Sequence, residues 1–173
     1  MMMNTALGLL FAAAACGRYQ FEAIADEGAP DAARTLLEMP GCVLATCDGV
    51  ALHLCSTLAT WQEGQAACTA ASSTLARIET ASHAVCVGYA MASAGIEYAW
   101  IGLVQAPGQP APDVGWTWNG SPAATTIFWA PAEPSDIDAV ESDEHDCGRV
   151  QAPNALAADR NCGDRMAYLC APR

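Results

Sequence analysis

Nine cysteines in a chain of 173 residues constrain the fold more than any other feature of this sequence. Such cysteine usage is typical of exported proteins stabilised by disulfides, because thiols stay reduced in the cytosol. A zinc site fits poorly, since the chain has no Cys-x-x-Cys pair and its three histidines, His53, His83 and His145, are scattered. The sequence therefore predicts a disulfide framework in an oxidising compartment.

The charge of the chain excludes one class of partner. The formal net charge is -12, and all seven basic residues are arginine. Such a surface repels phosphate backbones, so no nucleic acid is expected as a partner. The chain is 53% hydrophobic and only 15% charged, which suits a folded domain and not a disordered one. The absence of lysine beside abundant alanine indicates a bacterial protein from a GC-rich genome.

The N-terminal segment indicates export. Residues 6–15 form an apolar run that is too short to span a bilayer and is similar to a secretory signal. The end of this run resembles a bacterial lipobox, so lipid attachment at Cys16 and simple cleavage both remain open. We expect a signal peptide over 1–16, a tether over 17–41 and a folded domain over 42–173. The protein is then secreted or held at the cell surface, as an outer-membrane lipoprotein if Cys16 is acylated.

Capping signals predict two helices. Thr60 and Glu63 form a capping box, so a helix is expected to begin directly after Thr60. A second helix is capped by Thr80 or Ser82 and stops at Gly95. The side chains expected to be mostly buried on it are Val85, Val87, Tyr89 and Met91.

Alternating and continuous apolar runs predict the strands. They cover residues 51–55, 75–78, 98–104, 116–118, 147–150 and 165–170. Asn119-Gly120 is a strong hairpin turn signal, and this interpretation is favoured over a glycosylation site at the same asparagine. A loop rich in glycine and proline is expected over 105–115, and a long irregular stretch before residue 146.

Several short motifs occur in a fixed order. They are Trp100-Ile101-Gly102-Leu103, Gly115-Trp116-Thr117-Trp118-Asn119-Gly120, Glu133-Pro134-Ser135, Asp146-Cys147, Cys162 and Tyr168-Leu169-Cys170. Upstream, Trp61 and Cys68 lie on one helical face. Together these residues resemble the C-type lectin-like domain from about Cys42 to Cys170. The resemblance implies an α+β fold with two helices, short antiparallel sheets and a long irregular loop, stabilised by disulfides.

The resemblance also implies a disulfide pairing. It pairs Cys68 with Cys170 and Cys147 with Cys162, which stabilise the fold by about 4.7 and about 3 kcal/mol in the chain-entropy model. The remaining cysteines of the domain are Cys42, Cys47, Cys55 and Cys86. The first of these is expected to pair with Cys55 or with Cys47, and Cys86 with whichever of Cys55 and Cys47 remains.

The tryptophans divide into core and candidate contact residues. Trp100, Trp116 and Trp118 match core positions of the resembled family. Trp129 precedes the long loop and is the candidate for an exposed ligand contact. A sugar-stacking platform is therefore expected at Trp129 alone.

The loop over 133–146 carries the strongest chemical signal. It contains seven carboxylates and no basic residue: Glu133, Asp136, Asp138, Glu141, Asp143, Glu144 and Asp146. Crowded carboxylates raise each other's pKa, and Ca²⁺, which takes six to eight oxygen ligands, would relieve the repulsion.

In sugar-binding members of the resembled family, a Glu-Pro-Asn or Gln-Pro-Asp tripeptide, a Glu and a Trp-Asn-Asp motif hold calcium and sugar together. Glu133, the cis-forming Pro134 and Asp159 match this pattern. Ser135 replaces the amide, Ala157 and Ala158 replace Trp and Asn, and His145 stands at the Glu position beside Glu144. The expected metal ligands are Glu133, Ser135, Glu144 and Asp159, and the expected ligand-binding residues are Glu133, Ser135, Trp129 and Asp159, with Asp136 or Asp138 as substitutes.

Three functions follow as hypotheses. The first is a lectin in which Ca²⁺ in this loop binds a glycan, and the second is a calcium-independent module that binds a protein or serves a structural role. An enzyme is the third and is not favoured, since no Gly-x-Ser-x-Gly, His-Glu-x-x-His or Gly-x-Gly-x-x-Gly string occurs. The residues lost at Ser135 and Ala158 favour the second hypothesis over the first.

Overall fold

The computed structural model describes residues 39–135 and 145–173. The expected signal peptide, Cys16, most of the expected tether and the loop residues 136–144, which include Glu144, Asp136 and Asp138, lie outside the described residues. The elements in chain order are β1 Cys42–Cys47, β2 Val50–Ala59, α2 Trp61–Ala70, β3 Ser73–Leu75, α3 Ala81–Ser93, β4 Tyr98–Gln105, β5 Trp116–Trp118, β6 Cys147–Gln151, β7 Leu156–Arg160 and β8 Met166–Pro172.

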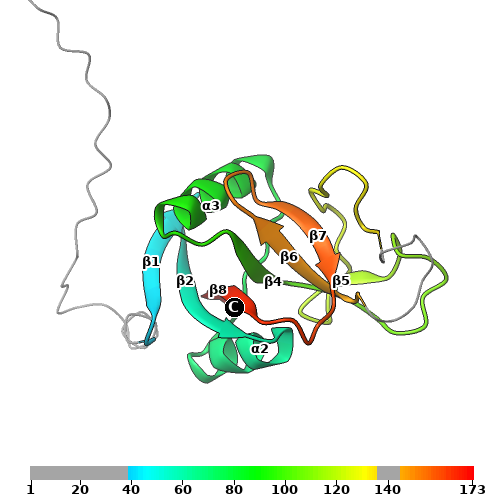
Figure 1. Ribbon diagram of the computed structural model, residues 1–173, viewed down its shortest axis with the longest axis horizontal. Coiled ribbons are helices and arrows are strands. Elements are labelled where there is room, and N and C mark those ends of the chain that lie inside the picture. The colour runs from blue at the N-terminus through cyan, green and yellow to red at the C-terminus, as the bar shows by residue number, and fades with distance from the viewer. Residues whose placement is uncertain (1–38, 136–144) are drawn as a thin grey trace, which may run out of the picture.

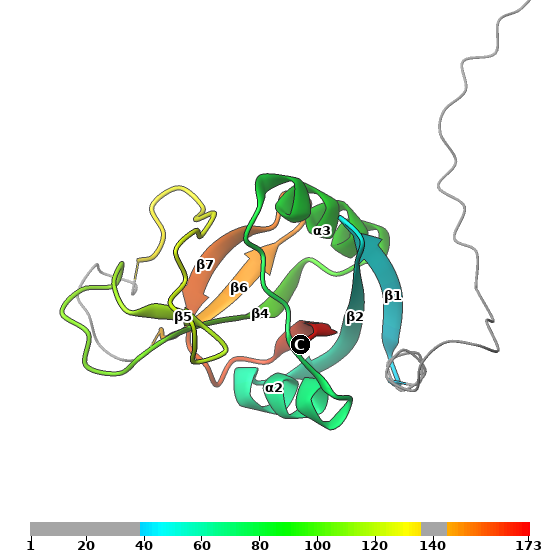
Figure 2. The same ribbon diagram turned by 180° about the vertical axis from the view of Figure 1, so that it is seen from behind.

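The described strands form one hydrogen-bonded network with the order β1-β2-β8-β4-β6-β7. β3 pairs with β8 and β5 pairs with β4. The pairs are antiparallel except β4–β8, which is parallel because the end of the chain returns to the middle of the network. α2 and α3 lie on opposite sides of the strands, and the loops around β5 extend from the far end (Figures 1 and 2). The α+β fold implied by the resemblance is confirmed.

The first helix follows the capping signal. Thr60 Oγ1 accepts from the Glu63 N–H, and Glu63 Oε2 accepts from the Thr60 N–H at 3.0 Å. The second helix is capped by Thr80, whose hydroxyl accepts from the His83 N–H, and the chain leaves it through Gly95 at φ +71°. Both helix predictions are confirmed.

The predicted buried face of α3 is only half right. Val87 and Met91 are buried, but Val85 is 52% exposed and Tyr89 is 65% exposed. The four residues lie two positions apart, whereas residues on one helical face recur every three or four positions. Val85 and Tyr89 therefore share the solvent face of the helix.

The strand predictions are confirmed in place but not in extent. β1 and β7 were missed, the predicted strand 51–55 extends over Val50–Ala59, and β3 ends at Leu75, where the strand predicted over 75–78 was expected to begin. The hairpin turn is confirmed: Asn119 and Gly120 have φ of 53° and 84°, and the Ser121 N–H donates to the Trp118 carbonyl at 3.0 Å.

Three tryptophans are buried in the core. Trp100, Trp116 and Trp118 are 0, 4 and 1% exposed, which confirms them as core residues. The indole N–H of Trp100 donates to the Ala59 carbonyl at 2.9 Å, and that of Trp61 donates to the Ile101 carbonyl at 2.9 Å. These bonds tie the ends of β2 and α2 to β4.

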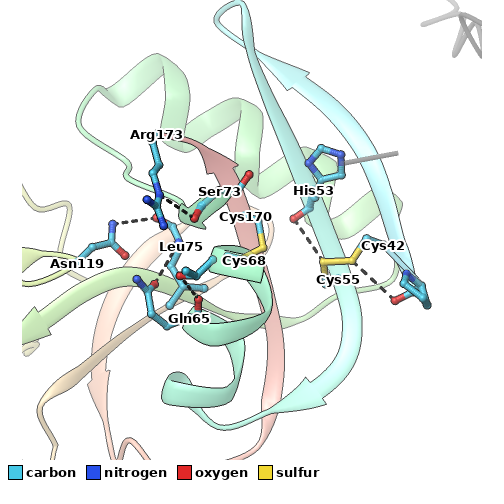
Figure 3. Close-up of a disulfide and its surroundings, with 12 residues drawn as sticks. Cys42, His53, Cys55, Gln65, Cys68, Ser73, Leu75, Asn119, Cys170 and Arg173 are labelled. Atoms are coloured by element: carbon cyan, nitrogen blue, oxygen red, sulfur yellow. Dashed lines mark hydrogen bonds between the residues drawn. A yellow bond between two sulfur atoms is a disulfide. The ribbon is translucent and has the colours of Figure 1, made fainter. Parts of the chain in front are cut away.

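Four disulfides link the described cysteines. They are Cys42–Cys55, Cys47–Cys86, Cys68–Cys170 and Cys147–Cys162, so the two pairs implied by the resemblance are present. Cys42 and Cys55 face each other in the β1–β2 register, as Figure 3 shows. The alternative Cys42–Cys47 pair is wrong, because these residues stand at opposite ends of one strand, roughly 16 Å apart at the strand rise.

Candidate functional site

The site predicted from the sequence lies where the chain passes β7 on its way to the long loop. The Ala157 N–H donates to the Phe128 carbonyl at 2.7 Å, and the Ala130 N–H donates to the Ala157 carbonyl at 2.8 Å. The Glu133 N–H then donates to the Ala130 carbonyl at 3.0 Å, which closes a turn. These backbone bonds hold residues 128–133 against β7.

Trp129 is half-buried in this segment. Its ring stands edge-on to Trp116, with the centroids 5.1 Å apart and the planes at 68°. Edge-to-face aromatic pairs of this kind stabilise packing. Trp129 was expected as an exposed contact, but the face that it turns to Trp116 belongs to the core.

Glu133, Ser135 and Asp159 come together at the end of β7. The Glu133–Pro134 peptide bond is cis, and the Ser135 N–H donates to Asp159 Oδ1 at 2.8 Å. Asp159 is 1% exposed, and the Glu133 side chain is 15% exposed. The structure therefore brings together three of the predicted residues, which we call the acid pair (Glu133 and Asp159) and its serine.

Two basic side chains of the protein lie against the acid pair. Arg160 Nη1 is 3.7 Å from Glu133 Oε1, and His145 Nδ1 is 3.8 Å from Asp159 Oδ2. Arg160 also donates to the Asp159 backbone carbonyl at 2.8 Å, so its side chain turns back along its own strand. Sequence reasoning missed Arg160, because neighbouring strand residues point to opposite faces and only this backward turn brings the guanidinium to Glu133.

The charge of the acid pair is only partly neutralised. Burial raises the pKa of Glu133 to about 7, and the neighbouring Asp159 carboxyl adds to that rise, while Ser135 and Arg160 act in the opposite direction. Two carboxylates this close resist simultaneous ionisation. Near neutral pH the Glu133 carboxyl therefore exists as a mixture of its protonated and ionised forms.

The described residues supply an incomplete set of ligands for calcium. They offer the two carboxylates of the acid pair and the Ser135 hydroxyl, against the six to eight oxygens that Ca²⁺ prefers. Ala157 and Ala158 are 3 and 6% exposed and are packed as apolar residues. Over residues 39–135 and 145–173, no group of three or more histidine, cysteine or acidic side chains is arranged to hold a metal. A calcium ion at the acid pair would therefore need further oxygen ligands from other residues, such as the expected ligand Glu144.

The fold is shared with known proteins. The family model described as "Lectin C-type domain" matches residues 57–172. Human lithostathine is similar in structure, with a TM-score of 0.61 and 16% identity over 78% of this chain and 89% of that one. The carbohydrate-recognition domain of the human scavenger receptor C-type lectin has a TM-score of 0.64 and 18% identity over 76% and 95%.

A calcium-independent type II antifreeze protein has a TM-score of 0.57 and 21% identity over 76% of this chain and 91% of that one. No curated protein matches the chain by sequence. At these identities the structural likeness establishes the fold, and ligands have to be argued from the site.

Proposed function

Because the chain belongs to the C-type lectin domain family, we propose that it is an exported binding module that holds a glycan or protein ligand without obligatory calcium. The observation that carries the proposal is the contact of Arg160 with Glu133 at 3.7 Å. In this arrangement the Arg160 guanidinium and the partial protonation of Glu133 take the place that a metal ion has in the calcium-dependent pattern. The ligand is expected at the end of the domain that carries the acid pair.

The lost ligand positions support the same proposal. Ala157 and Ala158 bring no oxygen in their side chains, and the described contact of Ser135 with Asp159 uses its backbone N–H. Even if both carboxylates of the acid pair bound through two oxygens each, they and the Ser135 hydroxyl would supply about five of the six to eight oxygens that a calcium ion takes, so the rest would have to come from other groups.

Calcium-dependent carbohydrate binding is the second candidate, and two observations favour it. The Glu133–Pro134 bond is cis, as in the calcium-binding pattern, and burial together with the neighbouring Asp159 carboxyl raises the pKa of Glu133 to about 7, which a bound cation would relieve. Glu133, Ser135, Asp159 and Glu144 would hold the ion, which would supply a Lewis-acidic centre for vicinal sugar hydroxyls. Both candidates describe binding and not catalysis.

A thermal melt of the oxidised full chain separates the two candidates. The melting temperature is measured in excess Ca²⁺ and then in a chelator, for the wild-type protein and for the matched variant Glu133→Ala. A site filled a thousandfold above its Kd would stabilise the fold by about 4 kcal/mol, which is a shift of many degrees. The first candidate predicts no shift in either protein. A shift that Glu133→Ala removes would establish the second candidate instead.

We also propose that the protein is a bacterial surface lipoprotein acylated at Cys16. Eight of the nine cysteines are in disulfides, which leaves Cys16 available for the lipid. No helix within the described residues is long and apolar enough to cross a membrane. Labelling cells with an alkynyl fatty acid tests the anchor: incorporation that Cys16→Ser abolishes supports it, and release of unlabelled protein into the medium refutes it.

A further inference from the structure

A cleft of about 660 Å³ opens on a part of the domain that shares no residue with the acid pair. It lies where β3, the end of β8, α2, the turn between β1 and β2, the start of α3 and the hairpin turn after β5 meet. The lining residues that matter for its chemistry are Gln65, Thr74, Arg77, Asn119, Ser121 and Arg173. Its walls are therefore rich in groups that donate hydrogen bonds.

Three of the five arginines in the described residues have an acidic or aromatic partner, and two have neither. Arg149 lies 4.0 Å over the Tyr98 ring, Arg160 contacts Glu133, and Arg165 pairs with Glu63 at 2.9 Å. Of the arginines within residues 39–135 and 145–173, only the remaining two, Arg77 and Arg173, have neither an acidic nor an aromatic partner.

Both of these arginines line the cleft. Arg77 Nη2 donates to the Ser121 carbonyl at 3.4 Å, and Arg173 Nε donates to the Ser73 carbonyl at 3.4 Å. These long bonds to neutral carbonyls orient the side chains but leave most of the five guanidinium N–H donors unused. In a protein with a net charge of -12, two guanidinium groups at one cleft without a carboxylate partner indicate a ligand that supplies the anion.

The amide side chains beside them are held in place by β3. Asn119 Nδ2 donates to the Leu75 carbonyl at 3.1 Å, and Gln65 Oε1 accepts from the Leu75 N–H at 3.3 Å. Figure 3 shows both amides and Arg173 converging on this short strand. The Gln65 NH₂ group and the Thr74 hydroxyl remain as polar groups for a ligand, and no phenylalanine, tyrosine or tryptophan side chain lines the cleft.

The acidic residues of the cleft lie beside its histidine. Asp48 accepts a hydrogen bond from the Ser82 hydroxyl at 2.7 Å. Burial lowers the pKa of His83, and the charges of Asp48 and Glu79 act on it in the opposite direction. These carboxylates are thus grouped around His83, and neither forms an ion pair with Arg77 or Arg173.

We propose that this cleft is a second binding site, for a saccharide that carries a carboxylate, such as a hexuronate. The guanidinium groups of Arg77 and Arg173 bind the carboxylate, and the amide and hydroxyl groups bind the ring hydroxyls. Neutral sugars bind poorly, because the cleft has no tryptophan, tyrosine or phenylalanine on which they stack, its His83 ring is buried, and recognition depends on the charge.

Titration calorimetry of the oxidised full chain with galacturonate and with galactose, which differ only at C6, tests the proposal. The titrations are made at low ionic strength with a chelator present. Galacturonate is expected to bind at least about tenfold more tightly than galactose, since a hydrogen bond to a charged group is worth about 1.5–3 kcal/mol. Arg77→Gln and Arg173→Gln are each expected to weaken galacturonate binding at least about tenfold.

Arg165→Gln is the matched control, because it removes one positive charge at a paired, exposed position, and it is expected to leave the affinity unchanged. Melting temperatures of all the variants establish whether they fold. If Arg173→Gln does not fold, Arg77→Gln alone is enough to test the proposal. Equal affinity for galactose, no galacturonate binding, or full binding in the folded arginine variants overturns the proposal. Binding that Glu133→Gln abolishes also overturns it and assigns the sugar to the acid pair.

Discussion

Replacing Glu133 by glutamine is expected to stabilise the protein at alkaline pH, although it removes an ion pair. The native state keeps Glu133 largely out of water beside the buried Asp159 carboxyl, which raises its pKa from 4.5 to about 7. In the unfolded chain the same carboxyl ionises near 4.5. The native state therefore binds the proton more tightly than the unfolded state does.

The difference between the native and unfolded pKa of Glu133 makes the stability of the wild-type protein depend on pH. A raised native pKa stabilises the fold below about pH 4.5, and this contribution is lost as the pH rises through about 7. At 1.36 kcal/mol for each pKa unit, wild-type protein loses about 3 kcal/mol between these limits. Glutamine does not titrate, so Glu133→Gln is expected to equal wild type near pH 4 and to exceed it by about 3 kcal/mol at pH 8.

Urea unfolding of the oxidised chain, followed by tryptophan fluorescence in the presence of a chelator, measures the difference. In thermal melts it corresponds to roughly 10 °C at pH 8. Glu97→Gln, at an exposed position, is the control and should follow the wild-type curve. If Glu133→Gln is no more stable than wild type at pH 8, Arg160 already neutralises the acid pair and the reasoning is wrong.

Three further predictions concern the scaffold. Gly88→Ala should cost about 3 kcal/mol in urea unfolding, because its Cβ would overlap the Pro153 backbone carbonyl, and an unchanged midpoint would contradict this packing. Replacing Cys47 and Cys86 together by alanine should cost about 4 kcal/mol for their separation of 39 residues, whereas a loss below about 1 kcal/mol would show that the bond is dispensable. In Glu133→Gln, stability should fall as the pH drops below 6.5, because burial lowers the pKa of His53 and of His83; a flat profile from pH 7 to 5 would refute this.

The sequence predicted correctly those helices and strands that depend on residues close together in the chain. Thr60 and Glu63 satisfy helix N–H groups within one turn, and the alternation of Trp116 to Trp118 places two indoles on one face of a strand. The predictions for α3 were wrong at Val85 and Tyr89, because the spacing used there did not match the helical period. β1 and β7 were missed because their pairing partners, β2 and β6, make them strands more than their own composition does.

The order of residue types along the chain was enough to predict the fold family, a disulfide framework in an oxidising compartment, and the grouping of Glu133, Ser135 and Asp159. These depend on residue types in a fixed order, which the chain carries whatever its conformation. Three other features became visible only in the folded chain: Arg160 turns back to Glu133, Cys47 bonds to Cys86, and Arg77 and Arg173 line one cleft. Each of these depends on the distance between side chains, which strand pairing and packing determine across long stretches of sequence.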